Sequence, residues 1–160
     1  MKPPWIIEAE KYIGLKEIKG PEHNPEILQW WKDIKRGGIK TDEMPWCAAF
    51  VGACLEKVGI QSSRFESARS YLQWGEPLPE AGYGCIVVFS RENGGHVGFV
   101  VGKDDTGRLM VLGGNQGDAV SIAPFNIMRV VGYRWPNGEP LEMEALPVIS
   151  SSTASSTNER

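Results

Sequence analysis

The sequence predicts a single α+β domain in which N-terminal helices pack on a C-terminal antiparallel sheet of about five strands. The chain has 160 residues, close to the roughly 150 residues of one domain. Helix-like patterns fill the first half and strand-like patterns fill the second, which favours segregated helices and strands over a β-α-β alternation. Short connections rich in Gly, Asn and Asp separate the predicted strands, which favours antiparallel neighbours.

The predicted helices have apolar residues at helical spacing and end residues that start or stop a helix. Pro4 and the pair Asn24-Pro25 begin the first two helices, because Asn caps a helix and Pro fits its first turn. Pro45 opens the third helix, which ends at Gly59. The four predicted helices span residues 4–13, 25–36, 45–58 and 67–74.

The strand-like segments are short runs of Val, Ile and aromatic residues. They span residues 85–90, 96–102, 108–114, 119–125 and 127–135. Residues 1–146 form the predicted domain. Residues 147–160 form a Ser/Thr-rich tail with nothing to bury, which we expect to be disordered.

The charge and hydropathy patterns exclude several classes of partner. The net charge is −3 and the pI is about 5.5, so neither nucleic acid nor an anionic membrane is an expected partner. No run of 18 apolar residues is present, so we expect no membrane insertion. Glu8, Glu10 and Lys11 interrupt the N-terminal apolar residues, unlike a signal peptide, and we expect synthesis in the cytoplasm.

Cys47 is the candidate nucleophile among three cysteines, too few for a disulfide framework. It lies in the first turn of the third predicted helix, where free N–H groups and the helix dipole favour a thiolate. Cys47 also belongs to an apolar stripe at helical spacing, so spacing alone slightly favours a structural role. Cys54, in the same helix, and Cys85, at the start of a strand, are interpreted as packing residues.

His96 is the candidate base, because a nucleophilic Cys needs one and the only other histidine, His23, lies in a polar segment before a helix. A symmetric turn over Asp104–Gly107 would pair His96 with Asn115 on the same face of the sheet. A bulge at the turn would shift the register by one and bring Gln116 opposite instead. The third member of a triad is therefore Asn115 or Gln116.

Other residue patterns carry weaker signals. The spacings of Cys and His typical of zinc are absent, and the full acidic loop of a calcium site is missing, so we expect no metal. Trp46, beside Cys47, and Trp74, after the segment SARSYLQ, are candidates for lining a substrate groove, although burial explains both equally well.

The segments PWCAAFV, SARSYLQWG, GGHVGF and VLGGNQGD together resemble the NlpC/P60- and CHAP-like cysteine peptidoglycan hydrolases, and most closely a compact prophage and phage endolysin-type group. The resemblance extends from about Trp5 to Pro136. Two features depart from this pattern. Many relatives have an acidic residue at the position of Cys85, and no recognisable wall-binding repeat follows the domain.

The resemblance implies a papain-like fold, with Cys47 as nucleophile, His96 as base and Asn115 as third member. It implies cleavage of an amide or peptide bond of peptidoglycan through an acyl-enzyme, without a cofactor. The endopeptidase and the muramoyl–alanine amidase reactions both remain open. An acyltransferase using the same dyad and a non-catalytic wall-binding module of the same fold are the alternatives.

The resemblance also implies where such a protein works and with what. Peptidoglycan is the implied substrate, and a holin, a tail particle or an immunity protein is a candidate partner of what we expect to be a monomer. An enzyme made in the cytoplasm without a signal peptide would then act in the periplasm or cell wall after release or delivery.

Overall fold

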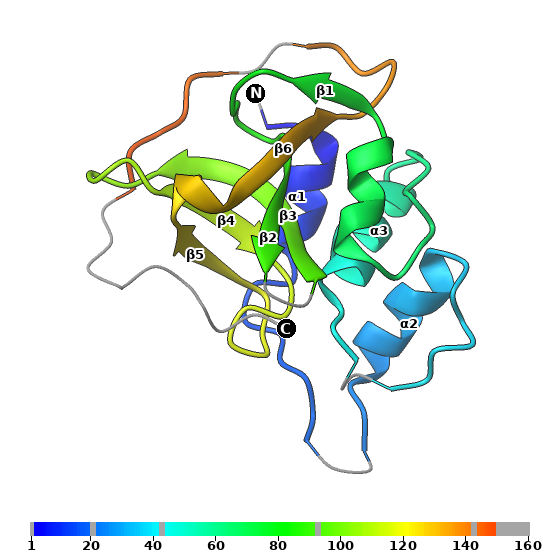
Figure 1. Ribbon diagram of the computed structural model, residues 1–160. Coiled ribbons are helices and arrows are strands. Elements are labelled where there is room, and N and C mark those ends of the chain that lie inside the picture. The colour runs from blue at the N-terminus through cyan, green and yellow to red at the C-terminus, as the bar shows by residue number, and fades with distance from the viewer. Residues whose placement is uncertain (1, 20–21, 42–43, 92–93, 142–143, 150–160) are drawn as a thin grey trace.

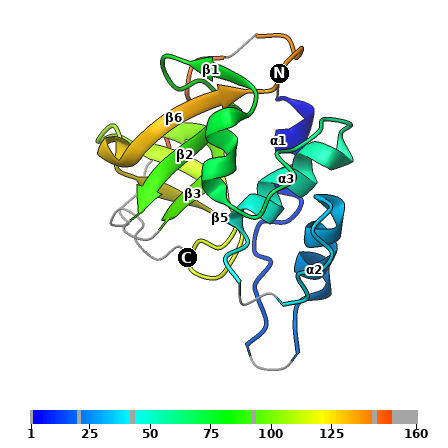
Figure 2. The same ribbon diagram turned by 45° about the vertical axis from the view of Figure 1, so that its right-hand side comes forward.

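Helices lie on one side of a six-stranded antiparallel sheet (Figures 1 and 2). The computed structural model describes residues 2–19, 22–41, 44–91, 94–141 and 144–149. The predicted α+β class and the order of helices followed by strands are confirmed. Within the described residues, no helix is long and apolar enough to cross a membrane.

The first two helices begin at the predicted prolines, whereas the third begins at Cys47, two residues after the predicted start at Pro45. Asn24 caps one of them, since its side chain accepts a hydrogen bond from the backbone N–H of Glu26 at 2.9 Å. The fourth predicted helix is a 3-10 helix instead of an α-helix. The helical elements are α1 (Pro4–Glu10), α2 (Pro25–Asp33), α3 (Cys47–Lys57), η1 (Ala68–Gln73) and η2 (Ile127–Arg129).

The sheet has the strand order β1-β6-β2-β3-β4-β5. The strands are β1 (Glu76–Leu78), β2 (Ile86–Arg91), β3 (Gly94–Lys103), β4 (Leu109–Gly113), β5 (Ser121–Phe125) and β6 (Val130–Trp135). β1 is one strand more than the sequence predicted. It has only three residues, one of them Pro77, and it pairs at the edge of the sheet, where a proline is tolerated.

The α3 helix is at the centre of the helical layer, and η1 also packs directly on β3. α1 and α2 pack on α3, and α3 packs on β3. At the centre of this layer, the Phe50 ring meets Phe99 of β3 edge-on at 6.3 Å and Trp30 of α2 at 5.3 Å. Residues 47–55 of α3 are all buried, so the start of this helix is held firmly against the sheet.

The hairpin between β3 and β4 departs from the symmetric register. Lys103 pairs with Leu109 next to the turn, one position away from the predicted pairing. An irregularity between Val100 and Gly102 then shifts the register by one, so the pairs farther from the turn follow the predicted register. β4 ends at Gly113, before it reaches the position opposite His96.

The chain also pairs with β3 beyond the predicted domain boundary at residue 146. Val148 forms a parallel bridge with Lys103, and the Ile149 backbone N–H donates to the Lys103 carbonyl at 2.7 Å. These two residues were predicted to be part of the tail, and they lie against the sheet. Residues 150–160 lie outside the described residues.

Candidate active site

The Cys47 thiol lies where the first turn of α3 meets β3. The backbone N–H groups of Val97 and Ala48 donate toward its sulfur, and Val97 directly follows His96 in the chain. Burial raises the pKa of the Cys47 thiol, while these N–H groups and the charge of Arg91 act in the opposite direction. Cys47 is therefore held beside the strand that carries His96.

A cavity of about 230 Å³ opens at Cys47 and is called the Cys47 cavity below. Cys47 is only 3% exposed, so the thiol forms part of the wall and does not project into solvent. The lining residues come from the start of α3, from η1 and from the adjoining ends of β2 and β3.

The other two cysteines are buried as predicted. Cys54 and Cys85 are 0% exposed. Burial raises the pKa of Cys54 well above its ordinary value and raises the pKa of Cys85 to about 12. Both thiols are therefore held in the protonated, unreactive form.

The His96 ring is fully buried and held by aromatic rings as well as by a hydrogen bond. It stacks on Phe125 with ring centroids 5.2 Å apart, and Phe89 stacks on Phe125 in turn at 4.6 Å. Nε2 of His96 lies 2.9 Å from the side-chain oxygen of Gln116.

The amide of Gln116 fixes the tautomer of His96. Its nitrogen donates to the Ser121 carbonyl at 2.9 Å and to the Val111 carbonyl at 3.2 Å, so its oxygen must face the imidazole. An oxygen can only accept, so Nε2 carries the proton in this hydrogen-bond assignment. The neutral ring then presents Nδ1 as the nitrogen that accepts a proton.

Two glycines allow the loop after β4 to reach both His96 and α3. A side chain at Gly113 would collide with the amide oxygen of Gln116 and would come within 3.3 Å of His96 Nε2. A side chain at Gly114 would collide with the Trp46 ring. The loop therefore contacts both Gln116, the hydrogen-bond partner of His96, and Trp46, the residue before Cys47.

Residues 39–115 match the family model of the CHAP domain. This segment is a CHAP domain. Such domains are cysteine- and histidine-dependent amidohydrolases or peptidases, and they act on peptidoglycan. The matched segment contains Cys47 and His96 and ends at Asn115, one residue before Gln116. No curated protein matches the chain.

Asn115 of the CHAP domain does not take the place that the symmetric register gave it. Its backbone has φ of 60°, a left-handed conformation that Asn tolerates better than most residues. The chain thus leaves the extended geometry of β4 before residue 115, and cross-strand pairing with His96 ends. The side-chain oxygen at His96 Nε2 belongs to Gln116, the alternative that the sequence left open.

The structure places the two predicted groove residues, Trp46 and Trp74, in different surroundings. Trp46 is 0% exposed and its indole N–H donates to Glu17 at 3.0 Å, so its prediction as a groove residue is wrong. Trp74 does not line the Cys47 cavity, but it lines a neighbouring hollow that shares Ser67 and Arg69 with it. A groove from Cys47 toward Trp74 therefore remains a prediction.

Metal-ligating side chains do not gather in the described residues. No group of three or more His, Cys, Asp or Glu side chains is arranged to hold a metal ion there. What the site offers instead is a thiol, an imidazole of defined tautomer and backbone N–H groups, which are the parts of a thiol hydrolase.

Proposed function

We propose that this protein hydrolyses an amide bond in the stem peptide of peptidoglycan, with Cys47 as nucleophile and His96 as base. The observation that carries the proposal is the hydrogen bond from His96 Nε2 to Gln116. This hydrogen bond leaves Nδ1 of His96 as the nitrogen that accepts a proton. Val97, the next residue in the chain, contacts the Cys47 thiol. Nucleophile, base and orienting group are the parts that acyl transfer requires.

In the proposed first step, the Cys47 sulfur attacks the carbonyl carbon and the thiol proton moves to Nδ1 of His96. A sulfur–carbon bond forms, and the carbonyl oxygen becomes an oxyanion stabilised by backbone N–H groups at the start of α3, that of Cys47 among them. The carbon–nitrogen bond then breaks, and His96 returns the proton to the leaving amine. Water subsequently hydrolyses the thioester, with His96 again acting as the base.

Gln116 is the proposed positioning residue for the imidazole. Its amide is 4% exposed and is itself anchored by Ser121 and Val111, so it has little freedom to turn. A neutral amide orients the ring without supplying a negative charge for the imidazolium. Asn115, the residue that the family resemblance favoured, remains the competing candidate for this role.

Digestion of purified sacculi tests the proposal directly. The wild-type protein should release soluble muropeptides, and mass spectrometry of the new termini distinguishes endopeptidase from amidase products. Cys47→Ala should release none, while Cys54→Ala serves as a matched control with a buried thiol removed. Binding of sacculi without release would indicate the wall-binding module, and transfer to an added amine in preference to water would indicate the acyltransferase.

The proposed substrate also determines where the enzyme acts. Peptidoglycan lies outside the cytoplasmic membrane, so the proposed place of action is the periplasm or the cell wall. Delivery by a holin-type lesion or a tail particle is part of this proposal. Lysis that occurs when the protein is directed to the periplasm, and does not occur when it is retained in the cytoplasm, would support it.

A further inference from the structure

Two guanidinium groups line the Cys47 cavity and differ in how they are bonded. Arg69, on η1, is exposed, and its Nε donates to the Gly94 carbonyl at 3.2 Å. Arg91, at the end of β2, has a side-chain nitrogen, one Nη, that is buried without a hydrogen-bond partner in the described part of the chain. Arg91 therefore contributes to this cavity a buried donor without an acceptor among the described residues.

The acidic residue of the same cavity has its described ion pair with a different arginine. Glu66 forms its ion pair with Arg36, at 3.2 Å between Nε and the carboxylate. Arg91 is also close enough to Cys47 for its charge to act on the thiol. A buried guanidinium nitrogen without an acceptor is costly, and an anion with two oxygens is the partner that its planar geometry fits best.

We propose that Arg91 binds a free carboxylate of the substrate next to the amide bond that Cys47 attacks. This inference rests on the proposed function and narrows its substrate class. The preferred amide lies within one residue of an unamidated carboxyl group, as in a stem peptide with acidic residues. Amidation of that carboxyl group replaces the anion with a neutral group and removes the attraction.

Alkylation of Cys47 tests the proposal without any hydrolytic activity. Iodoacetate and iodoacetamide transfer almost the same group to sulfur and differ in carrying a carboxylate or an amide. Arg91→Gln should lower the ratio of the iodoacetate rate to the iodoacetamide rate by about tenfold, as expected for the loss of one charge-assisted contact. A change in thiolate fraction affects both reagents equally and cancels in the ratio.

Matched variants separate binding from general electrostatics. Arg91→Lys should retain part of the preference for iodoacetate. Lys103→Gln removes one positive charge at the opposite end of β3 and should leave the ratio unchanged within about twofold, because exposed charges at that distance are screened. An unchanged ratio in a folded Arg91→Gln protein, verified by circular dichroism, would overturn the proposal.

A pair of muropeptide substrates extends the test to catalysis. The two substrates share the scissile amide and differ only in whether the neighbouring carboxyl group is free or amidated. Wild type should have a kcat/KM about tenfold or more higher for the free carboxylate, mainly through KM, and Arg91→Gln should lose this preference. Hydrolysis of neither substrate by wild type contradicts the proposed function, whereas equal hydrolysis of both contradicts only the role of Arg91.

Discussion

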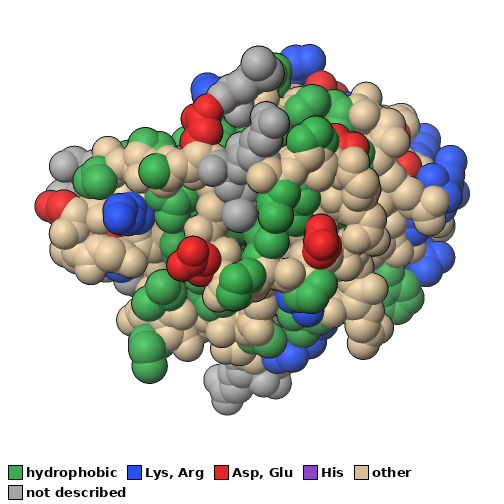
Figure 3. All heavy atoms as spheres, turned by 90° about the horizontal axis from the view of Figure 1, so that it is seen from above, with side chains coloured by type: hydrophobic (Ala, Val, Ile, Leu, Met, Phe, Trp, Pro, Cys, Tyr) green, Lys and Arg blue, Asp and Glu red, His purple; other side chains and the backbone are tan. Residues whose placement is uncertain are grey.

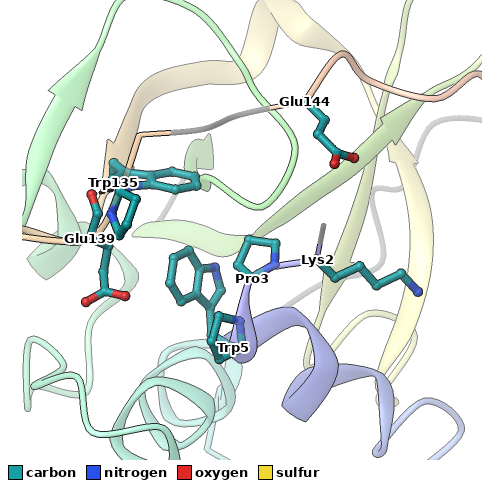
Figure 4. A pocket seen from close by; sticks show the side chains of 8 residues that line it. Lys2, Pro3, Trp5, Trp135, Glu139 and Glu144 are labelled. Atoms are coloured by element: carbon teal, nitrogen blue, oxygen red, sulfur yellow. Dashed lines mark hydrogen bonds between the residues drawn. The ribbon is translucent and has the colours of Figure 1, made fainter.

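The Cys47 cavity and a second cavity, between the start of α1 and the end of β6, are similar in size but differ in what lines them. The second one, called the Trp5 cavity, has a volume of about 300 Å³. Trp5, Trp135 and Pro3 form its wall, and Glu139 and Glu144 lie at its margin (Figure 4). Seen from above, hydrophobic side chains gather on this side of the molecule, with acidic side chains beside them (Figure 3).

The two cavities differ more in their polar groups than in their volumes. The Trp5 ring meets Trp135 edge-on at 5.3 Å, and its indole N–H donates to the Gly84 carbonyl at 2.8 Å. These contacts satisfy the indole N–H of Trp5 and join α1 to the sheet. The Cys47 cavity instead has a thiol in its wall and an arginine nitrogen that lacks a partner in the described residues. The smaller cavity therefore contains the proposed nucleophile.

The largest expected effect comes from removing the thiol. Cys47→Ala should lower hydrolysis of sacculi at least about 10³-fold, because the variant removes the thiol in the wall of the Cys47 cavity and leaves the proposed acyl transfer without its nucleophile. Its thermal melting should stay close to that of wild type. Residual activity within tenfold of wild type would place the chemistry elsewhere in the molecule.

The next effect concerns the orientation of His96. Gln116→Ala should lower kcat on the order of 10–10³-fold while KM changes little, since the variant loses the acceptor that fixes the tautomer. Asn115→Gly keeps the left-handed backbone at residue 115 and serves as the control. A greater loss in Asn115→Gly than in Gln116→Ala would reverse the assignment of the positioning residue.

The pH dependence of alkylation tests the raised pKa of the Cys47 thiol. Because burial raises the pKa of Cys47, the thiolate fraction near neutral pH is small. Its reaction with iodoacetamide should then accelerate about tenfold per pH unit and continue to rise above pH ~8.5, the ordinary thiol value. Mass spectrometry should find the label on Cys47. A plateau already reached below pH 7 would indicate a preformed thiolate–imidazolium pair.

The smallest expected effect on catalysis comes from the Trp5 cavity. Trp5→Ala should destabilise the fold by about 3–5 kcal/mol, and kcat/KM per folded molecule should remain within about twofold of wild type. Trp5→Phe is the milder variant if the alanine protein does not fold. Thermal melts and activity are measured on the same samples. A loss of activity in folded Trp5→Phe would mean that this cavity also contributes to function.

The sequence contained enough information to predict most elements and their order, but it missed β1 and predicted a strand where η2 forms. The start of a helix is determined by residues next to each other in the sequence. Asn24 and Pro25 specify the start of α2 through a capping hydrogen bond and a fixed φ. Residues 39–115, which match the CHAP domain, likewise contain the short motifs around Cys47 and His96. Neither feature depends on how distant parts of the chain pack.

What the sequence did not predict depends on tertiary packing. The irregularity after Val100 accommodates the hairpin within the sheet, and residue type does not specify it. Gln116 reaches His96 because Gly113 leaves space for its amide, which a pairing rule for strands does not consider. Burial of Trp46 depends on Glu17, which is 29 positions away in the sequence and accepts its N–H.

The pairing of Ile149 with Lys103 determines where an added module would emerge. Lys103 ends β3, whereas His96 lies near its beginning, and seven residues of extended strand separate them by roughly 23 Å. A purification tag, a fluorescent reporter or a wall-targeting domain joined after Ile149 would start from the side remote from the thiol. Modular fusions at this end should therefore leave the entrance to the Cys47 cavity open.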